Sequence, residues 1–270
     1  MSNDLMPPVV CIMGPTASGK TALALALADR VPCEIISVDS ALVYRGMDIG
    51  TAKPDALELQ QVPHHLIDIR DPADPYCVAD FRRDTLDLLK AVIGRNKLPV
   101  LVGGTMLYFR VLLDGMASMP PTDLAIRERI QQQAREFGWA SIHEQLAEVD
   151  PHSAKVIHPH HSQRLSRALE VFLSTGETLS SLHARQEAEL LPYHFSKLGL
   201  IIENRQWLHR RIADRFRCMI DQGLIEEVQA LHQRSDLHSD LPAIRAVGYR
   251  QVWDYLGGNL SREEMIDRAI

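Results

Sequence analysis

Cysteine pairs, long apolar stretches and charged leader segments are all missing from this chain. Its four cysteines are far apart in 270 residues and form no Cys-x-x-Cys pair, a spacing that is typical of reduced, mostly buried thiols. No apolar run approaches the roughly 18 residues that a membrane helix needs, and no charged-then-apolar leader opens the sequence. We therefore expect a soluble, unexported protein of the cytoplasm, a monomer without membrane contact.

An excess of basic residues is missing too. Lys and Arg number 29 against 35 Asp and Glu, which gives a net charge of -6. This balance excludes a generally basic nucleic-acid coat but leaves room for local basic patches. Hydrophobic residues make up 46% of the chain, enough for a sizeable core. The length fits one large domain or a domain with an insertion.

The segment that organises the chain has the spacing G-x-x-x-x-G-K-[ST]. It consists of Gly14, Pro15, Thr16, Ala17, Ser18, Gly19, Lys20 and Thr21. An apolar run precedes it and helix formers follow it, so strand, loop and helix come in the order that the motif requires. Loop N–H groups would face phosphate oxygens, Lys20 adds a positive charge, and the Thr21 hydroxyl can ligate Mg²⁺. The motif predicts a polyphosphate site, and a chance glycine-rich turn is the alternative.

Two further runs, residues 33–38 and 99–102, predict buried parallel strands. Asp39 and Ser40 follow the first run, and Thr105 closely follows the second. Ligands of open α/β sheets bind outside the carboxyl ends of the strands, so these side chains should lie beside the phosphate loop. The alternatives are that Asp39 caps a turn and that Thr105 caps the next helix. Residues 44–54, polar and broken by glycine, predict a surface loop.

The residue pattern changes after residue 115, where polar segments with a helical pattern begin and run to about residue 181. A strand pattern returns at residues 197–202. We therefore expect an α/β fold, a P-loop NTPase-like parallel sheet core with a helical insertion domain. The core would comprise residues 1–116 and 182–270, and the insertion residues 117–181. The last helix opens with a capping box and has no C-cap, so we expect it to continue past residue 270.

Arginines concentrate in two places in the second half. Five of them lie in residues 205–217, which predicts an anion site or a lid over a nucleotide, because the guanidinium group binds phosphate bidentately. Residues 245–250 combine two arginines with Tyr249, a pairing that stacks and anchors unpaired bases. Tyr249 is also a credible core residue. Arg164 and Arg167 lie on the polar side of a helix, where a solvated face is the simpler interpretation.

These segments together resemble the tRNA dimethylallyltransferases. The matching segments are GPTASGKT at residues 14–21, ISVDSALVYRGMDIGTAKP at 36–54, HHLID at 64–68, GGTMLYF at 103–109, DPHSAKVIHPHHSQRLSRALEVF at 150–172 and RAVGYRQVWDYL at 245–256. They span almost the whole chain in order. The first is shared by many nucleotide enzymes, whereas the second and the last are specific to the family.

The resemblance implies transfer of a dimethylallyl group from its diphosphate to the N6 amine of the adenosine beside the anticodon of tRNA. It also implies Mg²⁺, held through Thr21, and a tRNA-binding insertion. Asp39 would be the base that takes the amine proton, while Lys20, Thr105 and an arginine of residues 205–217 would hold the diphosphate. The anticodon stem-loop would contact Asp39, Ser40, Ala41, Leu42, Thr105, Arg127, Gln163, Arg164, Leu165, Ser166, Arg167, Arg245, Ala246, Val247, Gly248, Tyr249 and Arg250.

Two other functions remain open at this point. A small-molecule P-loop kinase would hold ATP in the same loop, and Asp39 would activate a substrate hydroxyl. A non-catalytic, nucleotide-gated RNA-binding protein would use the same arginines. ATP consumption distinguishes the kinase, and loss of turnover in an Asp39→Ala variant excludes the binding protein.

Overall fold

The computed structural model describes residues 6–117, 119–185 and 190–270. The chain divides into two compact units, one of residues 1–113 and 191–270 and one of residues 114–190. The boundaries predicted from sequence lie at 116/117 and 181/182. Both observed boundaries differ from these, the first only slightly. The second lies later because helix α8 (Leu179–Ala184) belongs to the inserted unit, where Ser180 donates two hydrogen bonds to the buried carboxylate of Asp150.

The first unit contains a five-stranded parallel sheet with the order β3-β2-β4-β1-β5. The strands are β1 (Pro8–Met13), β2 (Cys33–Val38), β3 (His64–His65), β4 (Leu98–Gly103) and β5 (His194–Gly199). Parallel neighbours need crossover connections, and helices supply them here. The α/β fold class expected from the sequence is therefore confirmed.

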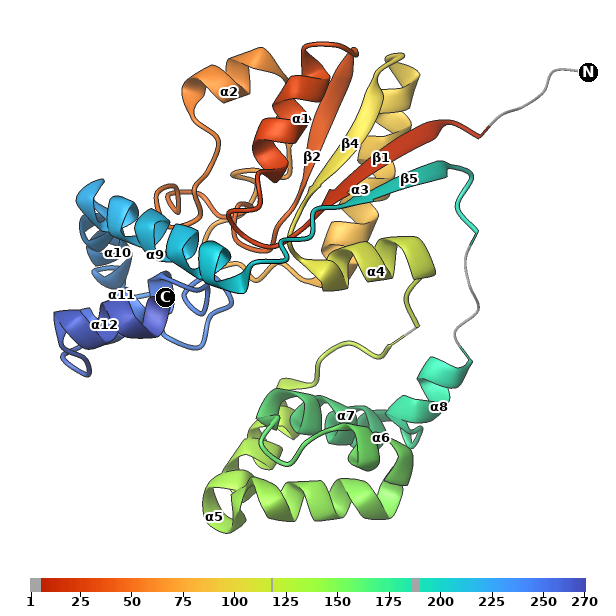
Figure 1. The fold of residues 1–270 in the computed structure, drawn as a ribbon. Coiled ribbons are helices and arrows are strands. Elements are labelled where there is room, and N and C mark those ends of the chain that lie inside the picture. The colour runs from red at the N-terminus through yellow and green to blue at the C-terminus, as the bar shows by residue number, and fades with distance from the viewer. Residues whose placement is uncertain (1–5, 118, 186–189) are drawn as a thin grey trace, which may run out of the picture. The chain divides into compact units, whose positions relative to one another are not determined.

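Alternate residues of the strands pack into two different hydrophobic cores, because successive side chains point to opposite faces of a sheet. Helix α1 (Lys20–Ala28) packs on the face that carries Ile12 and Val100. Helices α3 (Val78–Gly94) and α4 (Met106–Asp114) pack on the face that carries Cys11 and Leu101. A short helix, α2 (Ala56–Gln61), begins with a capping box. Figure 1 shows these helices around the sheet.

Four C-terminal helices gather beyond the carboxyl ends of the strands (Figure 1). They are α9 (Arg205–Asp221), α10 (Leu224–His232), α11 (Tyr249–Leu256) and α12 (Arg262–Ala269). Their apolar side chains join the larger core together with Val43, Tyr44 and Met47. The prediction of a loop over residues 44–54 is confirmed, and its polar residues Arg45 and Asp48 are exposed, but Tyr44 and Met47 are buried in this core.

Two other expectations need correction. Strand β5 begins and ends three residues before the predicted run at 197–202, and a bond from the amide of Leu200 to the carbonyl of Met13 at 2.7 Å ends its pairing with β1. As a largely exposed strand, β5 lacks the buried apolar pattern that locates a strand in sequence. All four cysteines are free, but two of them, Cys77 and Cys218, are exposed rather than buried.

The second unit is helical, as predicted. It comprises α5 (Leu124–Val149), α6 (Pro151–Val156), α7 (Ser162–Thr175) and α8. Helix α5 bends at Gly138, whose φ of 81° few other residues adopt. Helix α7 ends at Gly176, which takes the left-handed conformation that is common at helix C-caps. None of the helices in the described ranges is long and apolar enough to cross a bilayer.

Candidate active site

The phosphate loop follows β1 and leads into α1. Gly19 has a φ of 91° and Ala17 a φ of 62°, so the backbone turns sharply just before the helix begins. The Lys20 ammonium folds back over the loop and donates to the carbonyl of Pro15 at 2.6 Å. A sharp turn of this kind before a helix N-terminus, with a lysine beside it, is typical of loops that bind phosphate.

Three charged groups lie around this loop. Burial lowers the pKa of Lys20; the carboxylate of Asp39 raises it again, and the cation of Arg215 lowers it. Burial likewise lowers the pKa of Arg215, and Asp39 again opposes the shift. Two partly desolvated cations therefore face one carboxylate, an arrangement that favours a bound polyanion.

Asp39 lies at the carboxyl end of β2, as predicted. Its Oδ1 accepts hydrogen bonds from the amides of Ala41 at 2.8 Å and Leu42 at 3.4 Å, which makes a tight turn. The Ser40 amide donates to the hydroxyl of Thr105 at 3.2 Å. Asp39 therefore does cap a turn, as the alternative interpretation predicted, and it does so through Oδ1. Thr105 bonds the β2 turn in addition to preceding α4.

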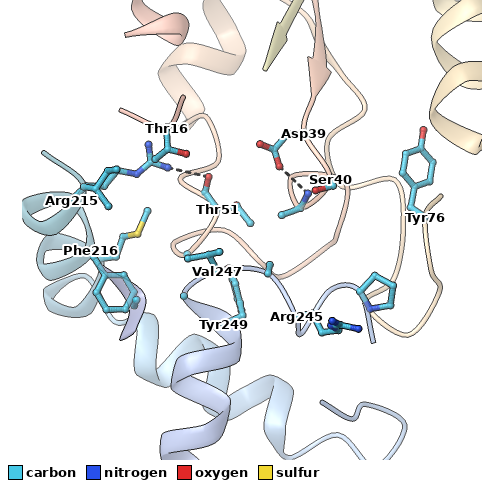
Figure 2. Close-up of a pocket in the computed structure, with 18 residues that line it drawn as sticks. Thr16, Asp39, Ser40, Thr51, Tyr76, Arg215, Phe216, Arg245, Val247 and Tyr249 are labelled. Atoms are coloured by element: carbon cyan, nitrogen blue, oxygen red, sulfur yellow. Dashed lines mark hydrogen bonds between the residues drawn. The ribbon is translucent and has the colours of Figure 1, made fainter. Parts of the chain in front are cut away.

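A cavity of about 480 Å³ opens next to Asp39. Its lining comes from the phosphate loop, the β2 turn, the loop around Thr51, helix α9 and the segment before α11 (Figure 2). Polar groups include Thr16, Asp39 and Arg215. An apolar side is made by Ile212, Phe216 and Met219, which are spaced along one face of α9. The cavity therefore joins an anion site, a carboxylate and an apolar wall.

Among the five arginines of residues 205–217, the structure singles out Arg215. Its guanidinium lies in the cavity near Thr16 and donates a long hydrogen bond, 3.5 Å, to the carbonyl of Thr51 (Figure 2). Arg211 instead lies over the ring of Trp207, and Arg217 pairs with Asp214. The other four arginines of this run are exposed: Arg205, Arg210, Arg211 and Arg217.

The predicted tRNA contacts of the inserted unit divide into two groups. Arg127 and Arg167 bind the buried carboxylate of Glu170, with shortest distances of 2.9 and 2.6 Å. Arg167 also donates to the carbonyl of Pro120 at 2.6 Å, so both arginines have structural partners. Leu165 and Ser166 are buried. The exposed residues at the start of α7 are Gln163 and Arg164.

Of the second predicted segment, residues 245–250, all but Arg250 line the cavity. Arg245, Val247 and Arg250 are exposed, whereas Gly248 and Tyr249 are buried. The Tyr249 hydroxyl donates to Glu227 at 2.5 Å, and burial together with that carboxylate raises the pKa of Tyr249. The core interpretation of Tyr249 is correct, although its ring also lines the cavity. RNA contact by the exposed members remains a prediction.

The phosphate loop fits a magnesium ion. The buried hydroxyl of Ser18 has no hydrogen-bond partner among the described residues, and the Thr21 hydroxyl is exposed at the start of α1. Mg²⁺ in such loops takes one protein hydroxyl, phosphate oxygens and several waters. No cluster of three or more acidic, His or Cys ligands occurs in the described ranges, and such a site does not require one.

Sequence reasoning missed several residues of the cavity. Thr51 and Tyr76 line it, and Glu227 holds its loop from a helix that is distant in the sequence. Tyr76 follows a stretch with no recognisable motif, and Glu227 lies in an ordinary amphipathic helix. No local signal marks either residue, because their contacts join segments that are far apart in the chain.

Comparisons with known proteins agree with this geometry. A sequence model of the IPP transferase family matches residues 42–270. The structure of the full-length tRNA isopentenylpyrophosphate transferase from Bacillus halodurans is 38% identical, with a TM-score of 0.67, covering 97% of this chain and 81% of that one. The corresponding tRNA delta(2)-isopentenylpyrophosphate transferase from Staphylococcus epidermidis is 35% identical, with a TM-score of 0.67, covering 97% and 85%.

A eukaryotic dimethylallyltransferase acting on tRNA shares the fold. It is 24% identical, with a TM-score of 0.79, covering 97% of this chain and 66% of that one. The family match extends over most of the sequence and includes the helices that line the cavity. This chain is therefore an enzyme that belongs to the IPP transferase family, the tRNA prenyltransferases.

Proposed function

We propose that this enzyme transfers a dimethylallyl group from dimethylallyl diphosphate to the exocyclic N6 amine of the adenosine 3′-adjacent to the anticodon of tRNA, releasing diphosphate. The observation that carries the proposal is the cavity beside Asp39. It has cations at the phosphate loop and apolar side chains on α9. A donor with an anionic head and a five-carbon tail matches both chemistries.

The reaction needs a base, because the lone pair of an adenine amine is delocalised into the ring. The N6 nitrogen attacks C1 of the dimethylallyl group, the C1–O bond breaks, and its electron pair leaves with the diphosphate. The amine proton passes to the carboxylate of Asp39. Since Oδ1 is occupied by the turn amides, Oδ2 is the oxygen left to accept this proton.

The leaving diphosphate gathers negative charge as the bond breaks, so its stabilisation lowers the barrier. Lys20 and Arg215 supply two cations at this place, and both are partly desolvated, which strengthens their effect. Mg²⁺, when bound through Thr21, would neutralise charge on the diphosphate oxygens. Thr105 acts through its bond to Ser40, which holds the Asp39 turn.

The tRNA surface is proposed from exposed groups. The exposed members of the predicted contacts are Ser40, Gln163, Arg164, Arg245, Val247 and Arg250, of which Ser40, Arg245 and Val247 line the cavity. The target adenine must leave its stack to reach Asp39, so neighbouring nucleotides need holding. Arginines at the cavity mouth are suited to that task, because they bind phosphate and stack on bases.

One assay tests the proposal directly. The protein is mixed with tRNA, Mg²⁺ and dimethylallyl diphosphate, and the tRNA is digested and analysed by mass spectrometry. A five-carbon mass gain on the adenosine next to the anticodon is expected, and a chelator should abolish it. Replacing the donor by ATP tests the kinase alternative. ATP consumption without a prenylated adenosine would contradict the proposal.

A further inference from the structure

Glu227 on α10 holds a loop that is far from it in the sequence. Its Oε2 accepts hydrogen bonds from the amides of Asp48 and Ile49, both at 2.8 Å. Its Oε1 accepts a third from the amide of Gly50 at 3.2 Å. Three consecutive N–H groups that converge on one carboxylate form an anion-binding concavity, and bonds to a charged acceptor are the strong ones.

The same carboxylate also holds Tyr249, a second lining residue that packs against this loop. The Tyr249 hydroxyl donates to Oε1 of Glu227 at 2.5 Å. The Tyr249 ring lies so close to Gly50 that a Cβ built on the glycine would fall 2.5 Å from it. Gly50 and Tyr249 both line the cavity. Glu227 therefore joins two walls of the cavity without lining it.

The loop that Glu227 holds continues into Thr51, which is the hydrogen-bond partner of Arg215. The Thr51 carbonyl accepts the hydrogen bond from Arg215, and the Thr51 hydroxyl donates to the carbonyl of Met47 at 2.6 Å. A displacement of residues 48–50 would move the Thr51 carbonyl and leave the guanidinium of Arg215 less restrained. Glu227 is thus connected to the phosphate loop through the backbone of residues 48–51 and the side chain of Arg215.

We propose that Glu227 is a positioning residue that sets Arg215 for the diphosphate and Tyr249 for the nucleotide side of the cavity. The inference rests on the proposed function, and it assigns Glu227 no contact with a reacting atom. Glu227→Gln keeps the size of the side chain but removes its charge and brings an N–H₂ group among donors. Glu226→Gln is the matched control, since Glu226 is exposed on the same turn of α10.

The first measurement is binding of inorganic diphosphate by calorimetry, with steady-state kinetics beside it. For Glu227→Gln we expect the affinity for diphosphate to fall about tenfold and the KM for dimethylallyl diphosphate to rise about tenfold, the effect of losing roughly one charged hydrogen bond at Arg215. We expect kcat to fall less. Glu226→Gln should match the wild type. Equal behaviour of the two variants would overturn the proposal.

The second measurement separates positioning from general loss of stability. In an Arg215→Ala background, Glu227→Gln should have little further effect on diphosphate affinity, because the group it positions is gone. Additive effects would overturn the proposal. If Glu227→Gln does not fold, as judged by melting, Glu227→Asp takes its place with the same expectations. Absence of prenyl transfer by the wild type would refute the proposed function, while the diphosphate measurements would still decide this inference.

Discussion

The amide of Ser40 donates a hydrogen bond to the hydroxyl of Thr105 at 3.2 Å, and this contact joins the ends of β2 and β4. The backbone of Thr105 adds a second tie, since its amide donates to the carbonyl of Val38 at 3.2 Å. The two strands are parallel neighbours, so their carboxyl ends meet at the same edge. The position of Asp39, one residue before Ser40, depends on this junction.

Thr105→Val should therefore impair catalysis without unfolding the protein. The change removes the acceptor for Ser40 but keeps the backbone bond to Val38. We expect kcat/KM to fall up to about tenfold, which is the value of one hydrogen bond of roughly 1 kcal/mol. Thr105→Ser keeps the hydroxyl and should stay near the wild-type value. An equal loss in both variants would contradict a specific role of the hydroxyl, because Thr105→Ser retains it.

Asp39→Asn should nearly abolish turnover and leave tRNA binding largely intact. The amide oxygen can still accept from Ala41 and Leu42, so the turn survives while the base is lost. General-base removal costs about 10²–10⁴-fold in rate. Single-turnover rates and tRNA affinity measured together test this expectation. Turnover within about tenfold of the wild type would argue against Asp39 as the base.

Arg164 and Arg167 should differ in what they do, although they lie on one helix. Arg164→Ala should weaken tRNA binding, reduce the salt slope by about one, and leave the melting temperature unchanged, because Arg164 is exposed. Arg167→Ala should instead destabilise the inserted unit by about 1–3 kcal/mol, since Glu170 loses a partner while buried. tRNA affinity at several salt concentrations and thermal melts distinguish the two effects.

Glu34 should make stability depend on pH in the acid range. Hydrogen bonds from Arg95 and His65, with Arg95 the larger cause, lower the pKa of Glu34 from 4.5 to about 2 although burial opposes them. A carboxylate whose pKa is lower in the folded state than in the unfolded state stabilises the folded protein at pH values above its unfolded-state pKa. This stabilisation is lost as the pH falls towards the folded-state pKa. Above pH 4.5 the free energy of unfolding of the wild type should exceed that of Glu34→Gln by about 1–2 kcal/mol. This value is reduced because Arg95 is half-exposed and solvent screens its charge.

That advantage should shrink as the pH falls from 4.5 towards 2. Urea unfolding of both proteins across this range checks the expectation. Asp84→Asn, a change of a carboxylate at a different place, serves as a comparison. A difference between the wild type and Glu34→Gln that stays constant with pH would contradict the assignment of the shift to Glu34.

Local patterns in the sequence determined much of the fold and part of the site. The phosphate loop, the buried strands β2 and β4, and helix α3 follow from short-range rules, because apolar periodicity and glycine turns act within a few residues. Asp39 and Thr105 followed from a general property of parallel sheets, that their carboxyl ends share an edge. The exposed strand β5 was misplaced because it has no buried face to give a pattern.

Only the tertiary structure decided which charged side chains line the cavity and which form structural ion pairs. It selected Arg215 from five arginines, because α9 turns that residue towards the phosphate loop and leaves Arg211 on Trp207. It pairs Arg127 with Glu170, which is 43 residues away in the sequence, whereas the pair of Arg167 and Glu170, three residues apart on one helix, is local. Charges on a helix look alike in sequence. Their roles depend on which distant carboxylate or carbonyl the packing brings within reach.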